Sequence, residues 1–228
     1  AAVGLGRRQR QRCLRALRCG PITWTNDCAA LSDLCGATGA ETVTFTATDD
    51  CGNTSTTTAT FTIEDTTDPV IATQATDQTV ECDGAGNSAA FAAWLSNNGG
   101  ATAGTEVCGT ATWSHNSAGL SDLCGATGAE TVTFTLTDEC GNTSTTTATF
   151  TIEDTTDPVI ASPASDLTVD CDGSGNSTDL NNWLTSNGGA GAATDDCGGV
   201  IWSHNFTALS DLCGATGAAT VIFTATDD

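Results

Sequence analysis

A period of 89 residues constrains the fold of this chain more than any other feature of its sequence. The segment Leu-Cys-Gly-Ala-Thr-Gly-Ala begins at Leu34, again at Leu123 and a third time at Leu212. The same spacing relates three tryptophans and several cysteines, which are Trp24, Trp113, Trp202, Cys19, Cys108, Cys197, Cys51, Cys140, Cys82 and Cys171. Self-similarity at a fixed spacing is the signature of a repeat architecture, in which each repeat is one structural unit. The sequence therefore predicts tandem repeats.

The linker Asp-Thr-Thr-Asp-Pro-Val, which starts at Asp65 and again at Asp154, marks the boundary between consecutive repeats. The predicted segments are a non-repeat stretch (1–18), a partial repeat (19–67), a complete repeat (68–156) and a partial repeat that lacks its last strand (157–228). We interpret the chain as a window cut from a longer array, or as a subunit that a neighbour completes.

The first 18 residues break the repeat pattern and hold all six basic residues, which are Arg7, Arg8, Arg10, Arg12, Arg15 and Arg18. One interpretation is a basic arm that docks on an acidic surface. The other is a sequence artefact such as a reading-frame slip. The artefact is favoured because the repeat register resumes abruptly at Cys19.

Polar and apolar residues alternate with period two in residues 131–137 and again in residues 147–152. Both segments are rich in β-branched residues, so they predict half-buried strands. Residues 138–142 supply the turn that joins them as a hairpin. Shorter elements are also predicted, namely strands at residues 78–81, 110–114 and 167–170 and a helix at residues 89–96.

Short strands, Gly, Asn and Asp turns and one core tryptophan in each repeat are typical of an immunoglobulin-like sandwich. The predicted core residues are Trp24, Trp113 and Trp202, with a sugar-stacking platform as the alternative role. We therefore predict an all-β chain of tandem immunoglobulin-like β-sandwich repeats of 89 residues, each with a short helix.

Three segments carry a resemblance to a known group, and they are residues 46–53 (Thr-Ala-Thr-Asp-Asp-Cys-Gly-Asn), 135–142 (Thr-Leu-Thr-Asp-Glu-Cys-Gly-Asn) and 152–158 (Ile-Glu-Asp-Thr-Thr-Asp-Pro). In these motifs the chain resembles the HYR-like, immunoglobulin-type tandem repeats of large secreted bacterial surface proteins, especially those of the Bacteroidetes. The resemblance covers Cys19 to Asp228 and implies stalk, adhesion or matrix roles outside the cell. It brings no catalytic residues.

Charge is distributed very unevenly, because all 28 acidic residues and no Lys or Arg lie between Cys19 and Asp228. Such a surface excludes nucleic acid and anionic membranes as partners. No run of about 20 apolar residues occurs, so insertion in a membrane is not predicted. Clustered carboxylates without basic partners favour a hard cation, and we predict Ca²⁺, which takes six to eight oxygen ligands.

The predicted calcium sites combine the acidic linkers with nearby hairpin turns, and the glycine-rich loops that start at Asp83 and Asp172 are a second candidate. The candidate ligands are Asp49, Asp50, Asn53, Glu64, Asp65, Asp68, Asp138, Glu139, Asn142, Asp154, Asp157, Asp83 and Asp172. The alternative is that these residues form ordinary solvated acidic turns.

The chain has 12 cysteines, and their pattern favours disulfides over zinc because no C-x-x-C pair occurs and His115 lies far from His204. The cysteines predicted to pair are Cys19, Cys35, Cys51, Cys82, Cys108, Cys124, Cys140, Cys171, Cys197 and Cys213. The four in the complete repeat allow three connectivities, of which we prefer Cys108 with Cys124 and Cys82 with Cys140. Disulfides predict an oxidising compartment.

No nucleophile triad, phosphate loop or H-E-x-x-H motif appears, and the acidic residues recur in turns, so we predict that the chain is not an enzyme. The predicted function is an extracellular stalk, fibre or filament, stiffened by calcium and polymerised head to tail by strand addition between chains. The alternative is an adhesive module that binds glycans or cell surfaces. Either role places the chain in secreted material or at the cell surface.

Glycosylation sequons occur at four positions, Asn53, Asn142, Asn176 and Asn205. Glycans there fit a surface protein. The alternative interpretation of the hydroxyl-rich segments that follow Asn53 and Asn142 is strand-forming threonine on an exposed face, and it is preferred for most positions.

Overall fold

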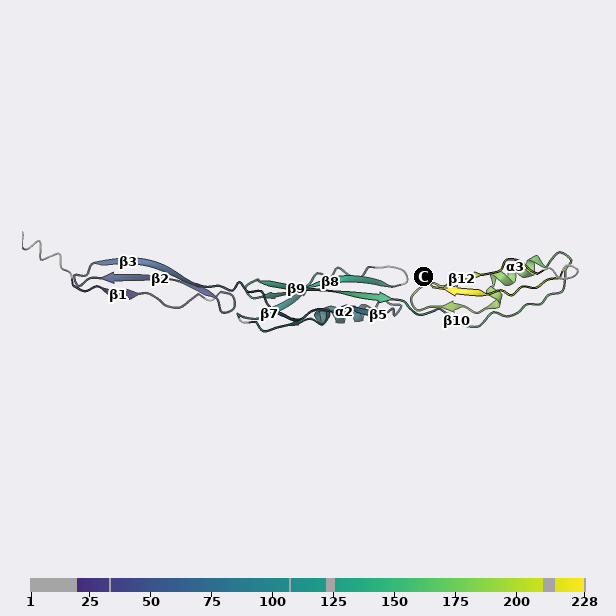
Figure 1. Cartoon of the computed structure of the whole chain (residues 1–228), viewed down its shortest axis with the longest axis horizontal. Helices are drawn as coiled ribbons and strands as arrows, with labels where there is room; N and C mark the ends of the chain where they lie inside the picture. Colours follow the sequence, from purple (N-terminus) through teal and green to yellow (C-terminus); the bar gives the residue numbers. More distant parts are fainter. Residues whose placement is uncertain (1–19, 33, 107, 122–125, 211–215, 228) are drawn as a thin grey trace, which may run out of the picture. The chain divides into compact units, whose positions relative to one another are not determined.

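The computed structural model describes residues 20–32, 34–106, 108–121, 126–210 and 216–227 (Figure 1). The described chain forms two compact units. The first holds the residues up to Val70 together with Gly104–Thr112 and Leu136–Ser144, and the second holds Ile71–Ala103, Trp113–Thr135 and the residues from Thr145 on. The predictions on segment 1–18, Cys19, Cys124 and Cys213 fall outside the described residues.

Most of the described elements are strands. In chain order the elements are β1 (Thr23–Asn26), β2 (Gly39–Thr48), β3 (Thr54–Ile63), β4 (Ile71–Thr73), β5 (Gln78–Glu81), α2 (Ser88–Ser96), η1 (Asn98–Gly100), β6 (Thr102–Ala103), β7 (Ala111–His115), β8 (Gly128–Asp138), β9 (Thr143–Glu153), β10 (Val159–Ile160), α3 (Ser177–Thr185), η2 (Asn187–Gly189), β11 (Ala193–Thr194), β12 (Ile201–His204) and β13 (Phe223–Thr226). The prediction of a mainly β chain with short helices is confirmed.

The largest described sheet has the strand order β5-β9-β8-β7. Strand β5 runs parallel to β9, with Gln78 opposite Phe150 and Glu81 opposite Glu153. A second sheet has the order β1-β2-β3, in which both pairs are antiparallel. Three two-stranded ladders join β4 to β6, β10 to β11 and β12 to β13.

Alternation along β8 and β9 builds the main core. Val132, Phe134 and Phe150 are fully buried, and the threonines between them lie on the other face of the sheet. Helix α2 lies beside this sheet (Figure 1) and supplies Trp94, whose ring centroid is 5.3 Å from that of Phe134 and 5.5 Å from that of Phe150. Sheet strands with period two and a short apolar helix therefore bury one another's faces.

Several described elements recur at the spacing of the sequence repeat. Helices α2 and α3 begin 89 residues apart, at Ser88 and Ser177. The Trp183 and Phe223 rings lie edge to face at 5.2 Å, as Trp94 and Phe134 do in the main core. The Trp–Phe pair of the main core thus recurs one repeat further along the chain.

The tryptophan prediction needs correction. Trp24 is 64% exposed, because the described first unit supplies no helix to cover the sheet β1-β2-β3. Trp113 is partly buried against the main core, and Trp202 is half-buried. The most buried tryptophan is Trp94, at 5% exposure, on the predicted helix.

The strand predicted at residues 167–170 is also wrong, since that segment has no strand structure. Its counterpart β5 is a strand because it bonds to β9. Among the described strands, none pairs with residues 167–170. A strand needs a partner for its backbone groups, and its own sequence does not supply one.

Candidate functional site at the repeat junctions

Two disulfides join consecutive repeats rather than cysteines of one repeat. Cys35 is bonded to Cys140 in the first unit, and Cys82 is bonded to Cys197 in the second. Their Cα–Cα distances of 5.1 and 5.8 Å lie in the usual range for a disulfide. Cys51 is disulfide-bonded as well.

The preferred pairing of Cys82 with Cys140 is wrong because β9 separates the two residues. Cys140 lies in the turn before β9, whereas the backbone N–H of Cys82 donates to the Glu153 carbonyl at the far end, at 2.9 Å. A strand of this length holds its ends roughly 35 Å apart. Such a distance excludes a bond within the repeat. In the other preferred pair, Cys108 has a free thiol and Cys124 lies outside the described residues.

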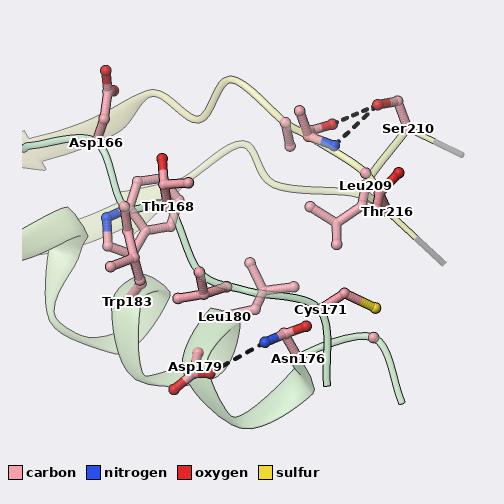
Figure 2. A pocket seen from close by; sticks show the side chains of 16 residues that line it. Asp166, Thr168, Cys171, Asn176, Asp179, Leu180, Trp183, Leu209, Ser210 and Thr216 are labelled. Atoms are coloured by element: carbon pink, nitrogen blue, oxygen red, sulfur yellow. Dashed lines mark hydrogen bonds between the residues drawn. The ribbon is translucent and has the colours of Figure 1, made fainter. Parts of the chain in front are cut away.

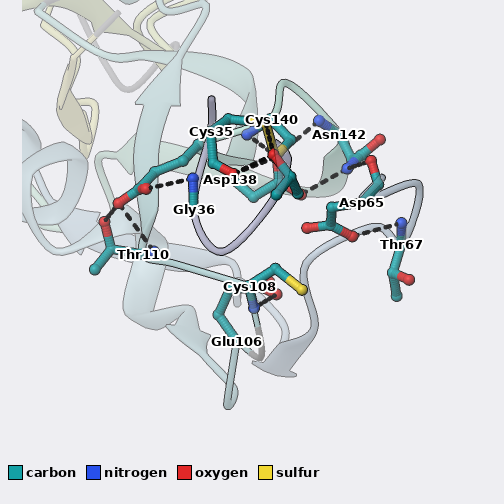
Figure 3. The surroundings of a disulfide bond; sticks show 12 residues. Cys35, Gly36, Asp65, Thr67, Glu106, Cys108, Thr110, Asp138, Cys140 and Asn142 are labelled. Carbon is teal, nitrogen blue, oxygen red and sulfur yellow. Dashed lines mark hydrogen bonds between the residues drawn. A yellow bond between two sulfur atoms is a disulfide. The ribbon is translucent and has the colours of Figure 1, made fainter. Parts of the chain in front are cut away.

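Hydrogen bonds surround the Cys35–Cys140 bond (Figure 3). The Glu139 carboxylate accepts from the Thr110 hydroxyl at 2.7 Å, from the Thr110 N–H at 3.2 Å and from the Gly36 N–H at 3.1 Å. These bonds, with those from Thr110 first, hold the pKa of Glu139 below its ordinary value. Glu139 therefore ties the turn of one repeat to the Cys35 loop of the preceding repeat.

Gly36 is required where that loop meets Cys108. Its φ is +55°, and a Cβ at this position would run into the Cys108 carbonyl oxygen. Only glycine combines a left-handed conformation with such a close approach. The glycine next to Cys35 thus allows the two repeats to come within disulfide distance.

The acidic turns satisfy their own carboxylates. Asp138 is 7% exposed and accepts from the Cys140 N–H at 2.8 Å and from the N–H and side-chain amide of Asn142 at 2.9 and 2.8 Å. Asp49 is held in the same way by Cys51 and Asn53. The Asn53 side-chain amide and then its backbone N–H lower the pKa of Asp49. These acids stabilise turns, which is the alternative that the sequence left open.

The loops that start at Asp83 and Asp172 follow the same rule. Asp83 accepts from the backbone N–H groups of Asn87 and Ala85 at 2.9 and 2.8 Å, and these bonds lower its pKa. Asp172 accepts from the N–H of Ser174 at 2.7 Å and from that of Asn176 at 3.0 Å. Both carboxylates are already occupied by the loops that they order.

The structure separates the first linker from the hairpin turn that precedes it in sequence. The turn of Asp49 and Asn53 precedes β3, and the linker with Asp65 follows it, so they lie at opposite ends of a ten-residue strand. Asp65 lies instead beside the turn of the next repeat, where the Asn142 amide donates to its carbonyl at 3.2 Å (Figure 3). Of the remaining candidates, Asp50 accepts from the Gly20 N–H at 2.6 Å. The exposed ones are Glu64, Asp68 and Asp157.

One acidic cluster was not anticipated. One carboxylate oxygen of Asp154, one of Asp195 and the Cys197 sulfur all lie within 4.8 Å of one another. Burial, followed by the charges of Asp154 and Asp195, raises the pKa of Asp227 above its ordinary value. The 89-residue spacing of Glu106 and Asp195 was the available signal, and it was missed because neither residue adjoins a linker.

Acidic residues and a cysteine occupy the equivalent positions at the first junction, where the repeat that ends at Thr67 meets the complete repeat. Asp65, Glu106, Cys108 and Asp138 precede Asp154, Asp195, Cys197 and Asp227 by 89 residues. The Oδ2 atom of Asp65 is buried and has no donor at hydrogen-bonding distance among the described residues. Both junctions thus concentrate negative charge beside a cysteine.

A groove of about 660 Å³ opens in the second unit (Figure 2). Residues 166–169 and 216–219 line the groove, together with Leu180, Trp183 and Leu209, and Leu209 lies beside Thr216 in Figure 2. In the preceding repeat the corresponding segments flank β9. The groove therefore lies where the complete repeat places a strand.

The sequon side chains already have structural roles. The amide nitrogens of Asn53, Asn142 and Asn176 donate to Asp49, Asp138 and the Asp170 carbonyl. Asn205 is exposed and uses its oxygen to accept from the Ile222 N–H at 2.8 Å. Glycosylation stays a prediction, and Asn205 fits it best.

No family model matches the chain, and no curated protein matches it either. None of the helices in the part of the chain that the structure describes has the length and apolarity needed to cross a membrane. The likeness to HYR-like repeats and the absence of enzymatic activity both stay predictions.

Proposed function

We propose that the chain is a load-bearing segment of an extracellular stalk or fibre built from tandem immunoglobulin-like repeats. The observation that carries this proposal is the overlap of the two disulfide loops. The loops run from Cys35 to Cys140 and from Cys82 to Cys197, so every residue between Cys35 and Cys197 lies inside at least one loop. Tension on such a chain is borne by covalent bonds even where a core has opened.

The disulfides also support a location outside the cell. Disulfides persist in secreted proteins and are rare in a reducing cytosol. The strand order β5-β9-β8-β7, with alternating core residues and short turns, supports immunoglobulin-like repeats.

Pulling a single molecule by its two ends tests the load-bearing role. In the reduced chain, 162 residues separate Cys35 from Cys197, whereas the bonded chain passes from Cys35 to Cys82 over 47 residues and then across a disulfide. At about 3.5 Å for each extended residue, the oxidised chain should be roughly 400 Å shorter at full extension. Equal lengths with and without reductant would refute covalent load sharing.

Calcium is the proposed stiffening ion, with the carboxylates of Asp154, Asp195 and Asp227 as ligands. The raised pKa of Asp227 reflects burial and the repulsion of its neighbours, and the chain has no Lys or Arg after Arg18 to relieve it. Ca²⁺ prefers such an oxygen-rich site. The melting temperature should rise with Ca²⁺, fall with EGTA and respond less in the double variant Asp154→Asn and Asp195→Asn. A wild-type melting temperature that chelation does not change would contradict the proposal.

Strand addition between chains is the proposed mode of polymerisation, and the groove of Figure 2 is its acceptor. Residues 143–152 fill the corresponding place in the complete repeat, and residues 54–63 have the identical sequence in the exposed strand β3. Sheet edges accept such strands through main-chain hydrogen bonds. A synthetic peptide of residues 143–153 should block self-association in light scattering, whereas a scrambled peptide should not. A chain that stays monomeric at high concentration with Ca²⁺ present would overturn this mode.

A further inference from the structure

The two observed disulfides each join one repeat to the next, but they use different cysteine positions of the repeat, with sequence separations of 105 and 115 residues. Moving forward by 89 residues takes Cys82 to Cys171, and moving back by 89 takes Cys197 to Cys108. The junction between the first two repeats contains the bonded pair Cys35–Cys140. It also contains Cys108, whose counterpart Cys197 is bonded to Cys82 of the repeat before it. By register, each junction has room for two disulfides.

Cys108 stands in the same setting as its bonded counterpart. The Glu106 carboxylate accepts from the Cys108 N–H at 3.3 Å, as Asp195 accepts from the Cys197 N–H at 2.7 Å. Asp65 faces Cys108 in Figure 3, and the equivalent Asp154 lies beside Cys197. Cys108 is half-buried and has a free thiol. Cys108 thus shares the acidic neighbours of Cys197, but it is less buried and lacks the bond.

We propose that Cys108 is the acceptor half of a second junction disulfide, and that its partner is a repeat of the same type presenting a Cys-Asp-Gly-x-Gly-Asn loop like residues 82–87. The inference rests on the proposed repeat array. Each sulfur loses its proton, the pair gives up two electrons, and a Sγ–Sγ bond forms. Glutathione disulfide, the oxidant, takes up these electrons and protons and leaves as two glutathione thiols.

The partner loop is ordered by its own contacts, so a short segment can reproduce it. Asp83 accepts from two backbone N–H groups of the loop, and the Asn87 amide donates to the Glu81 carbonyl at 2.9 Å. Gly84 has a φ of +71° and approaches the Asp196 carbonyl so closely that a Cβ would collide with it. A β-branched residue at Gly84 should therefore spoil the docking that precedes bond formation.

The acidic surroundings restrain Cys108 until a partner docks. Burial, followed by the charges of Asp65 and Glu106, raises the pKa of the Cys108 thiol. The thiolate is the reactive form, and a raised pKa keeps Cys108 mostly protonated at neutral pH. Small disulfides in solution therefore react with it slowly. Docking holds the two sulfurs together and raises their effective concentration, which favours the correct partner.

The test uses the full chain, a glutathione redox buffer at mildly alkaline pH and a peptide of residues 78–87. Mass spectrometry after proteolysis locates the peptide on Cys108 or on Cys28, which is exposed and also has a free thiol. The control peptide carries Gly84→Val. The native peptide should label Cys108 at least tenfold more than the control peptide does, and Cys28 should take up both equally.

Equal labelling of Cys108 by both peptides, or stronger labelling of Cys28, would overturn the inference. The disulfide map of the peptide-free sample separates this failure from a failure of the array. If Cys35–Cys140 and Cys82–Cys197 are present and Cys108 ignores the native peptide, the array proposal stands and the second junction bond is wrong. If the map instead finds Cys108 bonded to Cys140, both proposals are overturned.

Discussion

The sequence Thr-Ser-Thr-Thr-Thr-Ala-Thr-Phe-Thr-Ile occurs twice, as β3 and as the first ten residues of β9, and only packing distinguishes the two copies. Phe150 in β9 is fully buried, with its ring 5.3 Å from that of Phe91. Phe61 in β3 is 63% exposed. Replacing each phenylalanine by alanine therefore measures burial with the local sequence held constant.

The magnitudes follow from the buried area. A buried phenylalanine removes about 200 Å² from water, which at about 25 cal/mol per Å² is worth roughly 5 kcal/mol. Phe→Ala in a core typically costs about 3–5 kcal/mol, which includes the cavity left behind. At 63% exposure Phe61 buries only about a third of that area, so its loss should cost at most about 2 kcal/mol and leave no cavity.

Urea unfolding followed by tryptophan fluorescence reports both changes. Trp94 lies 5.5 Å from Phe150 and senses the main core, while Trp24 lies in β1 of the first sheet. We expect Phe150→Ala to lower the free energy of unfolding by about 3 kcal/mol more than Phe61→Ala does. Equal losses would refute the reasoning, because they would mean that the first sheet is covered in solution. Repeating the measurement at two protein concentrations would then show whether a second chain covers it.

Three further predictions concern the junctions and turns. Removing one junction bond with Cys35→Ala and Cys140→Ala should lower the free energy of unfolding by about 4–5 kcal/mol in oxidising urea titrations, because the bond closes a loop of 105 residues; an unchanged midpoint would contradict it. Gly36→Ala should abolish the same bond in a disulfide map, whereas Gly52→Ala should not, since the space around Gly52 is open although its φ is also positive. The lowered pKa values of Asp49, Asp83 and Asp172 mean that their stabilisation is complete above the ordinary aspartate pKa and is lost as the pH falls through the folded value. Thermal melts from neutral to strongly acidic pH should therefore show falling stability on the acid side, less steeply in Asp83→Asn, and a flat profile would contradict this assignment.

The sequence predicted the elements whose signals are local. Period-two alternation located β8 and β9, and a short apolar stretch located α2 within one residue of its start. Burial was harder to predict, because it depends on what covers a face. Trp24 and Trp113 occupy equivalent strand positions, yet only Trp113 packs against a core.

The predicted disulfide pairing was wrong because it did not take the direction of the strands into account. The four cysteines of the complete repeat were treated as one set, although Cys82 and Cys140 sit at opposite ends of β9. The parallel pairing of β5 with β9 creates this separation, and nothing local in the sequence indicates it. The acidic turns were recognised as special positions, but their carboxylates accept hydrogen bonds from their own loops.

One of the two observed disulfides lies in the main core, and the other does not. Cys82 and Cys197 are buried at 7% and 5% exposure and belong to the main core with Trp94 and Ile152. Cys35 and Cys140 are only half-buried, and Glu139 accepts hydrogen bonds from the N–H groups of Gly36 and Thr110 beside them. A buried disulfide is shielded from reductant until the packing around it opens, whereas a more accessible one is open to exchange. In an array with one bond of each kind at every junction, a reductant would break the accessible bond first and leave the buried bond intact. The repeats would then stay covalently joined although one of their two links is lost.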